Sequence, residues 1–252
     1  GPVFSRNYSI HNKTSFFFIK TFKNFSFLAW FKIFLRLIKI RPNIVFVHNF
    51  MIVPSIIYSL IFSKNIVYVD HSAINYKSYK DKLIAIILRI FFIDLIVLNY
   101  KNYQYYKKFK IFDKKIHLIK NGIDELFYKK TYKKKNKKVF SIGMAGRLDY
   151  FKKQELIIEA FLNSKLKKLN LSLSFAGDGP ELKHLKRKVK FYKIKNKVKF
   201  EGLLSEKKLK NWFNNLDLYI HASDGEAMST SILQAMSMEL AIAASNVDGI
   251  RN

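Results

Sequence analysis

Short runs of apolar, β-branched residues alternate along the chain with longer stretches in which apolar residues recur every three or four positions. The short runs are typical of parallel strands buried on both faces, and the longer stretches are typical of the helices that cover such a sheet. The alternation therefore predicts an α/β fold. The expected strands are 43–48, 65–70, 94–98, 115–119, 139–145, 171–176, 198–201, 218–221 and 241–244, and the expected helices are 16–38, 51–62, 79–92, 100–108, 153–162, 180–191, 205–214 and 228–238.

The alternation is interrupted near the middle of the chain. The sequence Asn-Gly-Ile-Asp at 121–124 has turn chemistry, and 128–138 carries seven lysines among eleven residues. Such a segment has little to bury and is typical of a solvated linker. A chain of 252 residues also exceeds the usual domain of about 100–200 residues. We therefore predict an N-terminal domain over 1–126, a lysine-rich linker over 127–138 and a C-terminal domain over 139–252.

The composition is that of a folded and strongly basic protein. Nearly half of the residues are hydrophobic, and the absence of cysteine excludes disulfides and thiolate metal sites. The net charge of +28 attracts anionic lipids, phosphorylated small molecules and, as the least favoured partner, nucleic acid. An equally good explanation is codon drift in an AT-rich genome, because asparagine, isoleucine and phenylalanine are abundant as well.

Two apolar stretches are poor candidates for spanning a membrane. Five cations interrupt 16–40, and 83–98 is short and contains Arg89 and Asp94, whereas a spanning helix needs about 20 apolar residues. Residues 1–15 lack the pattern of a signal peptide. The mixture of aromatic residues and spaced lysines in 16–40 fits a helix at an anionic membrane surface, although packing against its own sheet is the preferred interpretation. We expect a cytoplasmic protein, and the sequence is also compatible with its peripheral association with the inner face of the membrane.

Two cations follow the first strand of the second domain. Arg147 and Lys152 stand five residues apart across a strand-to-helix turn that begins at Gly146. The bidentate guanidinium and the mobile ammonium can both reach one diphosphate. Two ordinary surface cations are the alternative, and this pattern alone does not decide between them.

Further candidates follow other strands. The turn Gly177-Asp178-Gly179-Pro180 is by itself best explained as structural. Glu226 precedes a helix whose start, 229–231, is rich in hydroxyl groups and would present N–H groups to an anion. Glu226 itself either caps that helix or accepts hydrogen bonds from sugar hydroxyls.

His48 and His71 end neighbouring strands of the first domain, so both can face one cleft. For a single histidine at a strand end, a structural role is the more common one.

In combination and in this order, these segments resemble the retaining glycosyltransferases of the GT-B fold, the group 1 family that includes enzymes of bacterial surface-polysaccharide assembly. The resemblance extends from about residue 16 to the end of the chain. It implies two Rossmann-like domains that face a cleft, both incomplete here, with the first strand and its glycine-rich loop and the C-terminal end missing. The segments are RPNIVFVH (41–48), NIVYVDH (65–71), IHLIKNGID (116–124), GRLDYFKKQELIIEAF (146–161), FAGDGPEL (175–182) and 198–237.

The resemblance also implies roles. Arg147 and Lys152 would hold the donor diphosphate and stabilise its negative charge as it leaves, with Lys153 as a substitute at a position where the family usually has glycine. Glu226 would contact the transferred sugar, and His71 would lie near its anomeric carbon. The remaining expected contacts are Gly146, Gly177 and Gly179 at the glycine turns, Phe200, Gly202 and Leu203 at the base pocket, Ser229, Thr230 and Ser231 at the diphosphate, and Gln234 at the ribose.

The implied reaction is retaining transfer from a nucleotide-diphosphate sugar to a saccharide or lipid-linked acceptor, in surface-polysaccharide or lipopolysaccharide assembly. No cofactor and no metal are expected, since protein cations would do the work of Mg²⁺. Gln234 replaces the second glutamate of the family motif and keeps its hydrogen bond without its charge. Two alternatives remain: a basic protein that binds nucleic acid or acidic membranes, and a degenerate, inactive member of the family.

Overall fold

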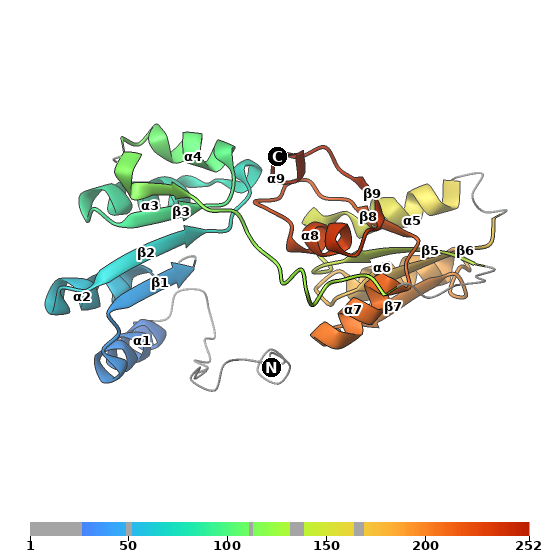
Figure 1. Ribbon diagram of the computed structural model, residues 1–252, viewed down its shortest axis with the longest axis horizontal. Coiled ribbons are helices and arrows are strands. Elements are labelled where there is room, and N and C mark those ends of the chain that lie inside the picture. Colours follow the sequence, from blue (N-terminus) through green and yellow to red (C-terminus); the bar gives the residue numbers. More distant parts are fainter. Residues whose placement is uncertain (1–26, 49–51, 111–112, 132–138, 164–168, 252) are drawn as a thin grey trace. The chain divides into compact units, whose positions relative to one another are not determined.

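The structure is a computed structural model that describes residues 27–48, 52–110, 113–131, 139–163 and 169–251 (Figure 1). The chain divides into two compact units, Gly1–Lys120 and Asn121–Asn252. Each contains one open, fully parallel sheet with helices packed on it, which confirms the predicted α/β class.

The first unit is built on four parallel strands in the order β1-β2-β3-β4. Its core contains fully buried side chains from the sheet and from the helices: Leu95 and Val97 of the strands, and Leu88 and Tyr106 of the helices. The elements are α1 (Phe27–Ile40), β1 (Ile44–His48), α2 (Ile52–Phe62), β2 (Asn65–Asp70), the 3₁₀ turn η1 (Ile74–Tyr76), α3 (Tyr79–Ile90), β3 (Asp94–Val97), α4 (Tyr100–Lys107), η2 (Asp113–Lys115) and β4 (Ile116–Leu118).

Local sequence signals fix where two of these helices begin. Ser78 and Asp81 form a capping box at the start of α3, in which the Ser78 backbone N–H donates to the Asp81 carboxylate at 2.7 Å. Asn99 caps α4 by accepting a hydrogen bond from the backbone of Asn102 at 2.8 Å. Asn99 lies close to the end of β3, whereas Ser78 follows the loop and η1 that come after β2, so each cap fixes the helix end of the segment that precedes it.

The second unit has five parallel strands in the order β7-β6-β5-β8-β9. Its elements are β5 (Phe140–Ala145), η3 (Tyr150–Lys152), α5 (Gln154–Asn163), β6 (Leu171–Ala176), α6 (Leu182–Phe191), β7 (Val198–Gly202), α7 (Glu206–Asn214), β8 (Leu218–His221), α8 (Thr230–Ser237), β9 (Ala241–Ala244) and α9 (Asp248–Arg251).

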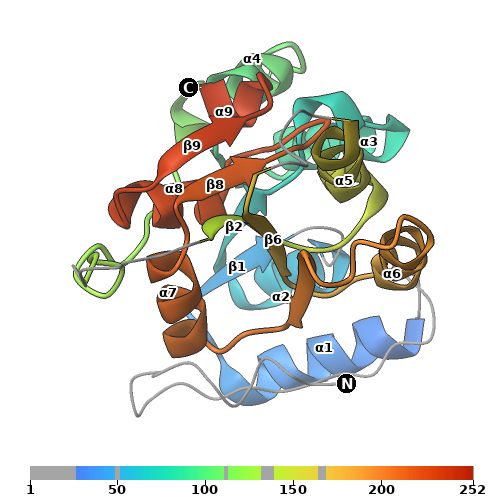
Figure 2. The same cartoon turned by 90° about the vertical axis from the view of Figure 1, so that its right-hand side faces the viewer.

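Apolar side chains cover both faces of this second sheet. One buried cluster joins the sheet to α5 and α6, and the other joins it to α7 and α8. Figure 2 shows the two pairs of helices on opposite sides of the sheet. Since all five strands are parallel, the loops that follow β5, β6, β7 and β8 emerge along the same carboxyl edge.

The observed elements differ from the predicted ones mainly at their ends. Of the predicted helix 16–38, residues 16–26 lie outside the described residues, and α1 continues to Ile40. The helix predicted from 153 begins one residue later, because Lys153 adopts a left-handed backbone with φ of 45°. The 3₁₀ turns and α9 had no counterpart in the prediction.

The second residue of the predicted linker, Tyr128, is part of the core of the second unit. Tyr128 is 3% exposed and lies edge-on to Phe213, with ring centroids 6.3 Å apart. The contact-based division falls earlier, between Lys120 and Asn121, and residues 132–138 lie outside the described part of the chain. Tyr128 is therefore a core residue, which the lysine-rich composition of the segment did not indicate.

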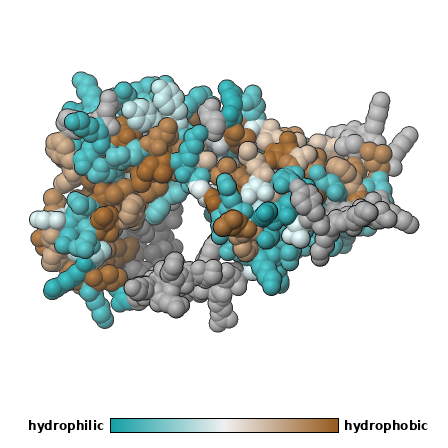
Figure 3. Space-filling model, viewed as in Figure 1, coloured by the Kyte–Doolittle hydropathy of each residue, from teal (hydrophilic) through white to brown (hydrophobic). Residues whose placement is uncertain are grey.

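Hydrophobic residues also reach the surface of the first unit (Figure 3). On α1, an outward stripe consists of Phe27, Leu28, Phe31 and Leu35, and Phe27 is 87% exposed. Within the described residues, no helix has both the length and the apolar character needed to cross a membrane.

Candidate functional site at the carboxyl edge of the second sheet

Three turns at the carboxyl edge are tied together by backbone hydrogen bonds. Gly146 donates to the carbonyl of Ala176 at 2.9 Å, which joins the turn after β5 to the end of β6. Gly177 donates to the carbonyl of Gly202 at 2.8 Å, which joins the turn after β6 to the end of β7. The carboxyl edge therefore has one rigid backbone frame on which side chains are mounted.

Close approach of these turns explains two of the glycines. A Cβ on Gly177 would lie 1.9 Å from the carbonyl oxygen of Gly146, and a Cβ on Gly179 would lie 2.2 Å from that of Leu148. Both distances are far shorter than any real contact, and both neighbours are backbone atoms that cannot turn aside. These glycines thus have a steric role in packing turn against turn.

Lys152 and Glu226 meet at this edge from neighbouring strands. Lys152 is the last residue of η3, after β5, and its Nζ lies 2.5 Å from Oε1 of Glu226 in the loop after β8. The two side chains are 22% and 10% exposed. The structure therefore brings together two of the residues that the sequence singled out.

His221 is the second side chain that contacts the Glu226 carboxylate. The Nε2 atom of this fully buried histidine lies 2.8 Å from the same Oε1. Burial pushes the pKa of Glu226 upward, but the hydrogen bond from His221 and the charge of Lys152 outweigh it, so the pKa falls from 4.5 to about 2. The carboxylate is therefore ionised throughout the neutral range.

Arg147 presents its guanidinium at the surface of the same frame. Its side chain is 71% exposed and its Nε lies 3.6 Å from Oδ2 of Asp149. Its backbone carbonyl accepts a hydrogen bond from the buried side chain of Gln154 at 2.8 Å. The main chain is thereby fixed, while the charged end is available to a ligand.

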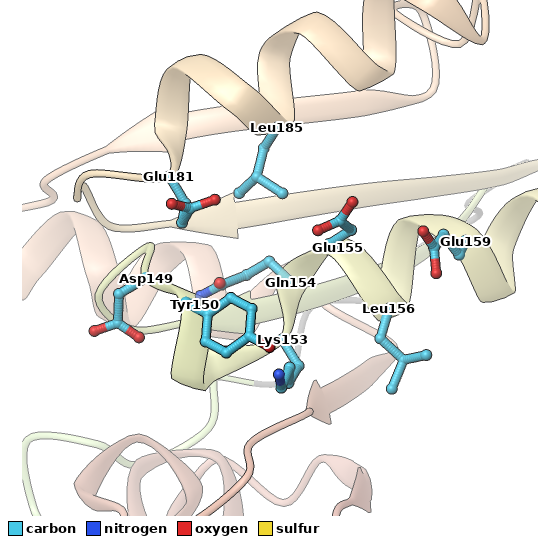
Figure 4. Close-up of a pocket in the computed structure, with 9 residues that line it drawn as sticks. All are labelled: Asp149, Tyr150, Lys153, Gln154, Glu155, Leu156, Glu159, Glu181 and Leu185. Atoms are coloured by element: carbon cyan, nitrogen blue, oxygen red, sulfur yellow. The ribbon is translucent and has the colours of Figure 1, made fainter.

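Lys153 points into a different environment from Lys152. Its Nζ pairs with Oδ2 of Asp224 at 2.8 Å and lies 3.8 Å from the ring centre of Tyr150. Figure 4 shows Lys153 and Tyr150 side by side at a pocket of about 350 Å³ between α5 and the start of α6. Four carboxylates line this pocket and would repel a diphosphate: Asp149, Glu155, Glu159 and Glu181.

The start of α8 lies close to this edge and carries three hydroxyl groups. Ser229 is the buried N-cap residue, and its Oγ lies 3.1 Å from Oγ of Ser231, while Thr230 is exposed. Because Ser229 makes no side-chain cap, its hydroxyl does not compete for the backbone N–H groups of the first turn. Gln234 is half-buried one turn further along the helix.

Of the residues expected at the base pocket, Phe200 and Gly202 lie in β7 and Leu203 directly follows it. Phe200 is half-buried and stacks on Phe175 with ring centroids 5.5 Å apart, so one face of its ring belongs to the core. Gly202 adopts φ of 70°, and Leu203 beyond it is exposed.

The two strand-end histidines of the first unit contact each other. Nδ1 of His48 lies 2.7 Å from Nε2 of His71, and the rings are stacked. Burial and the neighbouring His48 lower the pKa of His71, and only Asp70 opposes this. His71 is accordingly neutral at pH 7 and can exchange hydrogen bonds with a ligand.

A buried ionic network holds the segment around His71. Lys77 lies 2.5 Å from Asp70 and donates to Ser72 Oγ at 2.7 Å and to Tyr106 at 3.1 Å. Asn102 donates to Asp70 at 3.0 Å. Since both charges of the pair are almost completely buried, this network fixes the loop after β2.

Among the described residues, no group of three or more histidine, aspartate or glutamate side chains could hold a metal ion.

Two further site residues, His221 and Tyr219, were missed by the sequence analysis. The signal that could have found His221 was its position at a strand end, the same signal that drew attention to His48 and His71.

The family Glycosyl transferases group 1 matches residues 125–252, about half of the chain and all of the frame described above. The chain belongs to this family. A group 1 glycosyltransferase relationship was thus correctly inferred from the sequence motifs.

Two relatives illustrate how far the sequence similarity extends. Protein CapJ of Staphylococcus aureus is 37% identical over 111 residues, which cover 43% of this chain and 28% of CapJ. The uncharacterized glycosyltransferase MJ1069 of Methanocaldococcus jannaschii is 33% identical over 144 residues, covering 54% of this chain and 36% of that protein. The matched part of the chain therefore spans only about a third of these relatives.

Solved structures extend the likeness to both units at the level of the fold. HepE from Anabaena, in complex with UDP and glucose, superposes with a TM-score of 0.74 at 20% identity over 88% of this chain and 64% of HepE. A Staphylococcus aureus TarM variant, in complex with fondaparinux, α-GlcNAc-glycerol and UDP, gives 0.70 at 15% identity over 87% and 45%. The chain has the α/β architecture of GT-B glycosyltransferases.

Proposed function

We propose that the chain transfers a sugar from a nucleotide-diphosphate donor to a saccharide or lipid-linked acceptor, with retention of anomeric configuration. The second unit binds the donor, and the first unit serves the acceptor side. The observation that carries the proposal is the meeting of Lys152 and Glu226 on the glycine-turn frame, with the exposed Arg147 beside it.

Each residue has a definite part in this reaction. The bond between the anomeric carbon and the diphosphate oxygen breaks, and the diphosphate leaves with the electron pair. Arg147 and Lys152 stabilise that negative charge, and the first turn of α8 faces it. The acceptor hydroxyl attacks the same face and passes its proton to the departing diphosphate, while Glu226 holds the sugar hydroxyls.

Lys152 can serve Glu226 and the diphosphate at the same time. An ammonium group has three N–H donors, of which one is directed at Glu226. His71, being neutral, would donate to or accept from a hydroxyl group of a ligand rather than add charge. The proposed chemistry needs no metal, because side-chain cations neutralise the leaving group.

The biological setting is proposed from the relatives. HepE has been crystallised with UDP-glucose, and TarM with UDP, which supports a uridine-linked donor. A role in bacterial surface-polysaccharide or lipopolysaccharide assembly, at the cytoplasmic side of the membrane, is consistent with such donors.

The test is calorimetric titration of UDP, GDP and ADP into the wild type, Arg147→Ala and Glu226→Ala at moderate salt. We expect saturable binding of one nucleotide that Arg147→Ala weakens at least tenfold, since charge-assisted hydrogen bonds contribute about 1.5–3 kcal/mol. Glu226→Ala should reduce the affinity for the corresponding nucleotide sugar more than that for the nucleotide.

Arg187→Ala is the matched control, because Arg187 is an exposed arginine of α6 and has no part in the proposed site. Equal weakening by Arg147→Ala and Arg187→Ala, with a steep loss of binding in added salt, would instead support a general polyanion binder. Gln234→Glu in the same titration addresses the degenerate-enzyme alternative: a gain of several-fold in affinity would show a ribose contact that has lost its charge.

A second, accompanying function is association with anionic membranes. The outward stripe of α1 exposes Phe27, Leu28, Phe31 and Leu35, and Lys32 and Lys39 are exposed on the same helix. Aromatic and aliphatic side chains beside lysines fit the boundary between lipid headgroups and acyl chains.

Co-sedimentation with phosphatidylglycerol vesicles at low salt tests this. We expect Phe31→Ser with Leu35→Ser to reduce binding at least fivefold, whereas Leu156→Ser, an exposed leucine of α5, leaves it unchanged. Absence of wild-type binding at low salt would exclude the lipid-facing role.

A further inference from the structure

A chain of buried hydrogen-bonding groups leads away from Glu226 into the second unit. His221 ends β8 and Tyr219 lies two residues before it on the same strand, and both side chains are fully buried. Nε2 of His221 lies 2.8 Å from Oε1 of Glu226, and Nδ1 lies 3.1 Å from the hydroxyl of Tyr219. Both ring nitrogens are therefore used.

The chain continues to the first turn of α8. The Tyr219 hydroxyl lies 2.8 Å from Oγ of Ser231, which in turn lies 3.1 Å from Oγ of Ser229. His221, Tyr219 and Ser231 thus connect the proposed sugar-binding carboxylate to Ser229 at the helix start. We call the set Glu226, His221, Tyr219 and Ser231 the relay.

Counting protons assigns a direction to the relay. The ionised Glu226 can only accept, so Nε2 of His221 must carry a proton. Burial raises the pKa of Tyr219, so its hydroxyl keeps the single proton it can donate. The hydroxyl donates to Oγ of Ser231 at 2.8 Å, and with a neutral imidazole the same proton is shared with Nδ1 of His221 at 3.1 Å.

A second arrangement exists when the imidazole carries both protons. Nδ1 then donates to Tyr219, whose own proton turns to the carbonyl of Ala145 at 3.2 Å. In both arrangements Nε2 donates to Glu226, so the histidine holds the carboxylate in either state. With a neutral imidazole, the serine end and the carboxylate end are connected through the tyrosine proton.

We propose that His221 is a positioning residue for the donor sugar: through the relay it fixes the Glu226 carboxylate relative to Ser231 at the start of α8. This rests on the proposed function, in which Glu226 contacts the sugar and the first turn of α8 faces the diphosphate. The relay would therefore set the spacing between the sugar and diphosphate subsites, and with it which donor sugars fit.

A purely apolar filling of this position would be simpler for the core. Tyr219 belongs to a buried cluster that includes Phe213, Ile232 and Ala235, and unpaired polar groups in such surroundings are destabilising. The polar pair is compatible with the core because every step of the relay has a partner. The Nε2 atom of the buried histidine is therefore satisfied only while Glu226 accepts its hydrogen bond.

The first arm of the test measures the Glu226 carboxyl carbon by NMR during acid titration. In His221→Leu the midpoint should rise by at least about one pH unit, whereas His221→Gln, whose amide can donate in place of Nε2, should restore much of the wild-type value. The other charged groups on the surrounding elements stay in place: Lys152, Lys153 with Asp224, and Asp248 and Arg251 of α9. An unchanged midpoint in His221→Leu would overturn the proposal.

The second arm compares binding of UDP with binding of UDP-glucose. His221→Leu should weaken UDP-glucose about tenfold and leave UDP within twofold, because only the sugar contacts Glu226. Tyr219→Phe keeps the ring but removes the hydroxyl of the relay. It should also weaken UDP-glucose more than UDP, but by less than His221→Leu does. Equal losses for both ligands would indicate a merely structural role and sink the inference.

His184→Leu is the matched control. His184 contacts Glu155 at 3.2 Å on the same unit, but at an exposed helix pair outside the relay. It should change neither the Glu226 midpoint nor the UDP-glucose affinity. If His221→Leu fails to fold, the same two measurements on His221→Gln and Tyr219→Phe test the proposal instead. If the wild type binds neither ligand, the proposed function fails, and the NMR arm still judges the relay.

Discussion

Burial and two neighbouring groups, His221 and Lys152, set the charge state of the Glu226 carboxylate. Its burial alone would favour the neutral acid, yet the hydrogen bond from His221 and the ammonium of Lys152 keep it charged. A buried carboxylate with these partners is preorganised as an acceptor for hydroxyl groups, since it does not need to reorient when a ligand arrives. It also contributes to stability in a manner that depends on pH.

The pKa of Glu226 predicts acid sensitivity. Because the folded pKa of about 2 lies below the unfolded value, ionisation stabilises the fold above pH 4.5, and this stabilisation is lost as the pH falls towards 2. By pH 3 the loss should reach about 2 kcal/mol. Urea unfolding at pH 7 and pH 3 will measure it, with Glu226→Gln as the reference. An equal pH dependence in both proteins would show that Glu226 does not titrate as described.

At the scale of the element, the turns after β5, β6 and β7 form one packed unit. Their backbone hydrogen bonds bind the strands to one another beyond the end of the sheet. A further backbone hydrogen bond, from the N–H of Asp224 to the carbonyl of Phe151 at 3.0 Å, holds η3, and therefore Lys152, against the loop that carries Glu226. The geometry of the candidate site thus depends on contacts that no charged side chain makes.

Gly177→Ala should consequently disrupt the frame. The new methyl group would lie 1.9 Å from the carbonyl of Gly146, so the backbone must shift. We expect a loss of about 3 kcal/mol or more in the free energy of unfolding, together with loss of nucleotide binding. Gly122→Ala is the control, because no atom lies within 4 Å of a Cβ at that position. Urea titration followed by circular dichroism gives both values, and similar values would contradict the steric role.

The sequence predicted these elements better than it predicted their termini or their side-chain pairs. Every predicted strand is present, because β-branched runs between helices leave little ambiguity. The start of α5 was misplaced by one residue because a lysine does not itself indicate a left-handed backbone, although the glycine usual in the family at this position is typical of one. Arg147, Lys152 and Glu226 were recognised by motif, but the link between Lys152 and Glu226 joins residues 74 apart in sequence and emerges only in the folded sheet.

At the scale of the whole molecule, the two units have separate cores and separate polar networks. The network of the first unit, centred on Asp70 and Lys77, lies within Gly1–Lys120, and the frame that carries Lys152 and Glu226 lies within Asn121–Asn252. Damage to one core is therefore expected to leave the ligand site of the other largely intact.

Lys77→Met tests this independence. It leaves Asp70 buried without its cation, which typically costs about 3–5 kcal/mol. We expect calorimetry to show a lower transition temperature for the first unit, while UDP affinity stays within twofold of the wild type. Lys82→Met, at an exposed position of α3, should change neither quantity. A parallel loss of UDP binding in Lys77→Met would mean that the units unfold together.

The packing of the glycine turns also bears on how this sequence is able to evolve. The chain is rich in lysine and has only nine glycines in 252 residues, as expected when base composition drives codons away from glycine. Four of the nine, Gly146, Gly177, Gly179 and Gly202, lie in or beside the three turns after β5, β6 and β7. At Gly177 and Gly179 any first side-chain atom would collide with backbone, so drift in base composition cannot replace these two glycines without a shift of the frame that holds the candidate site.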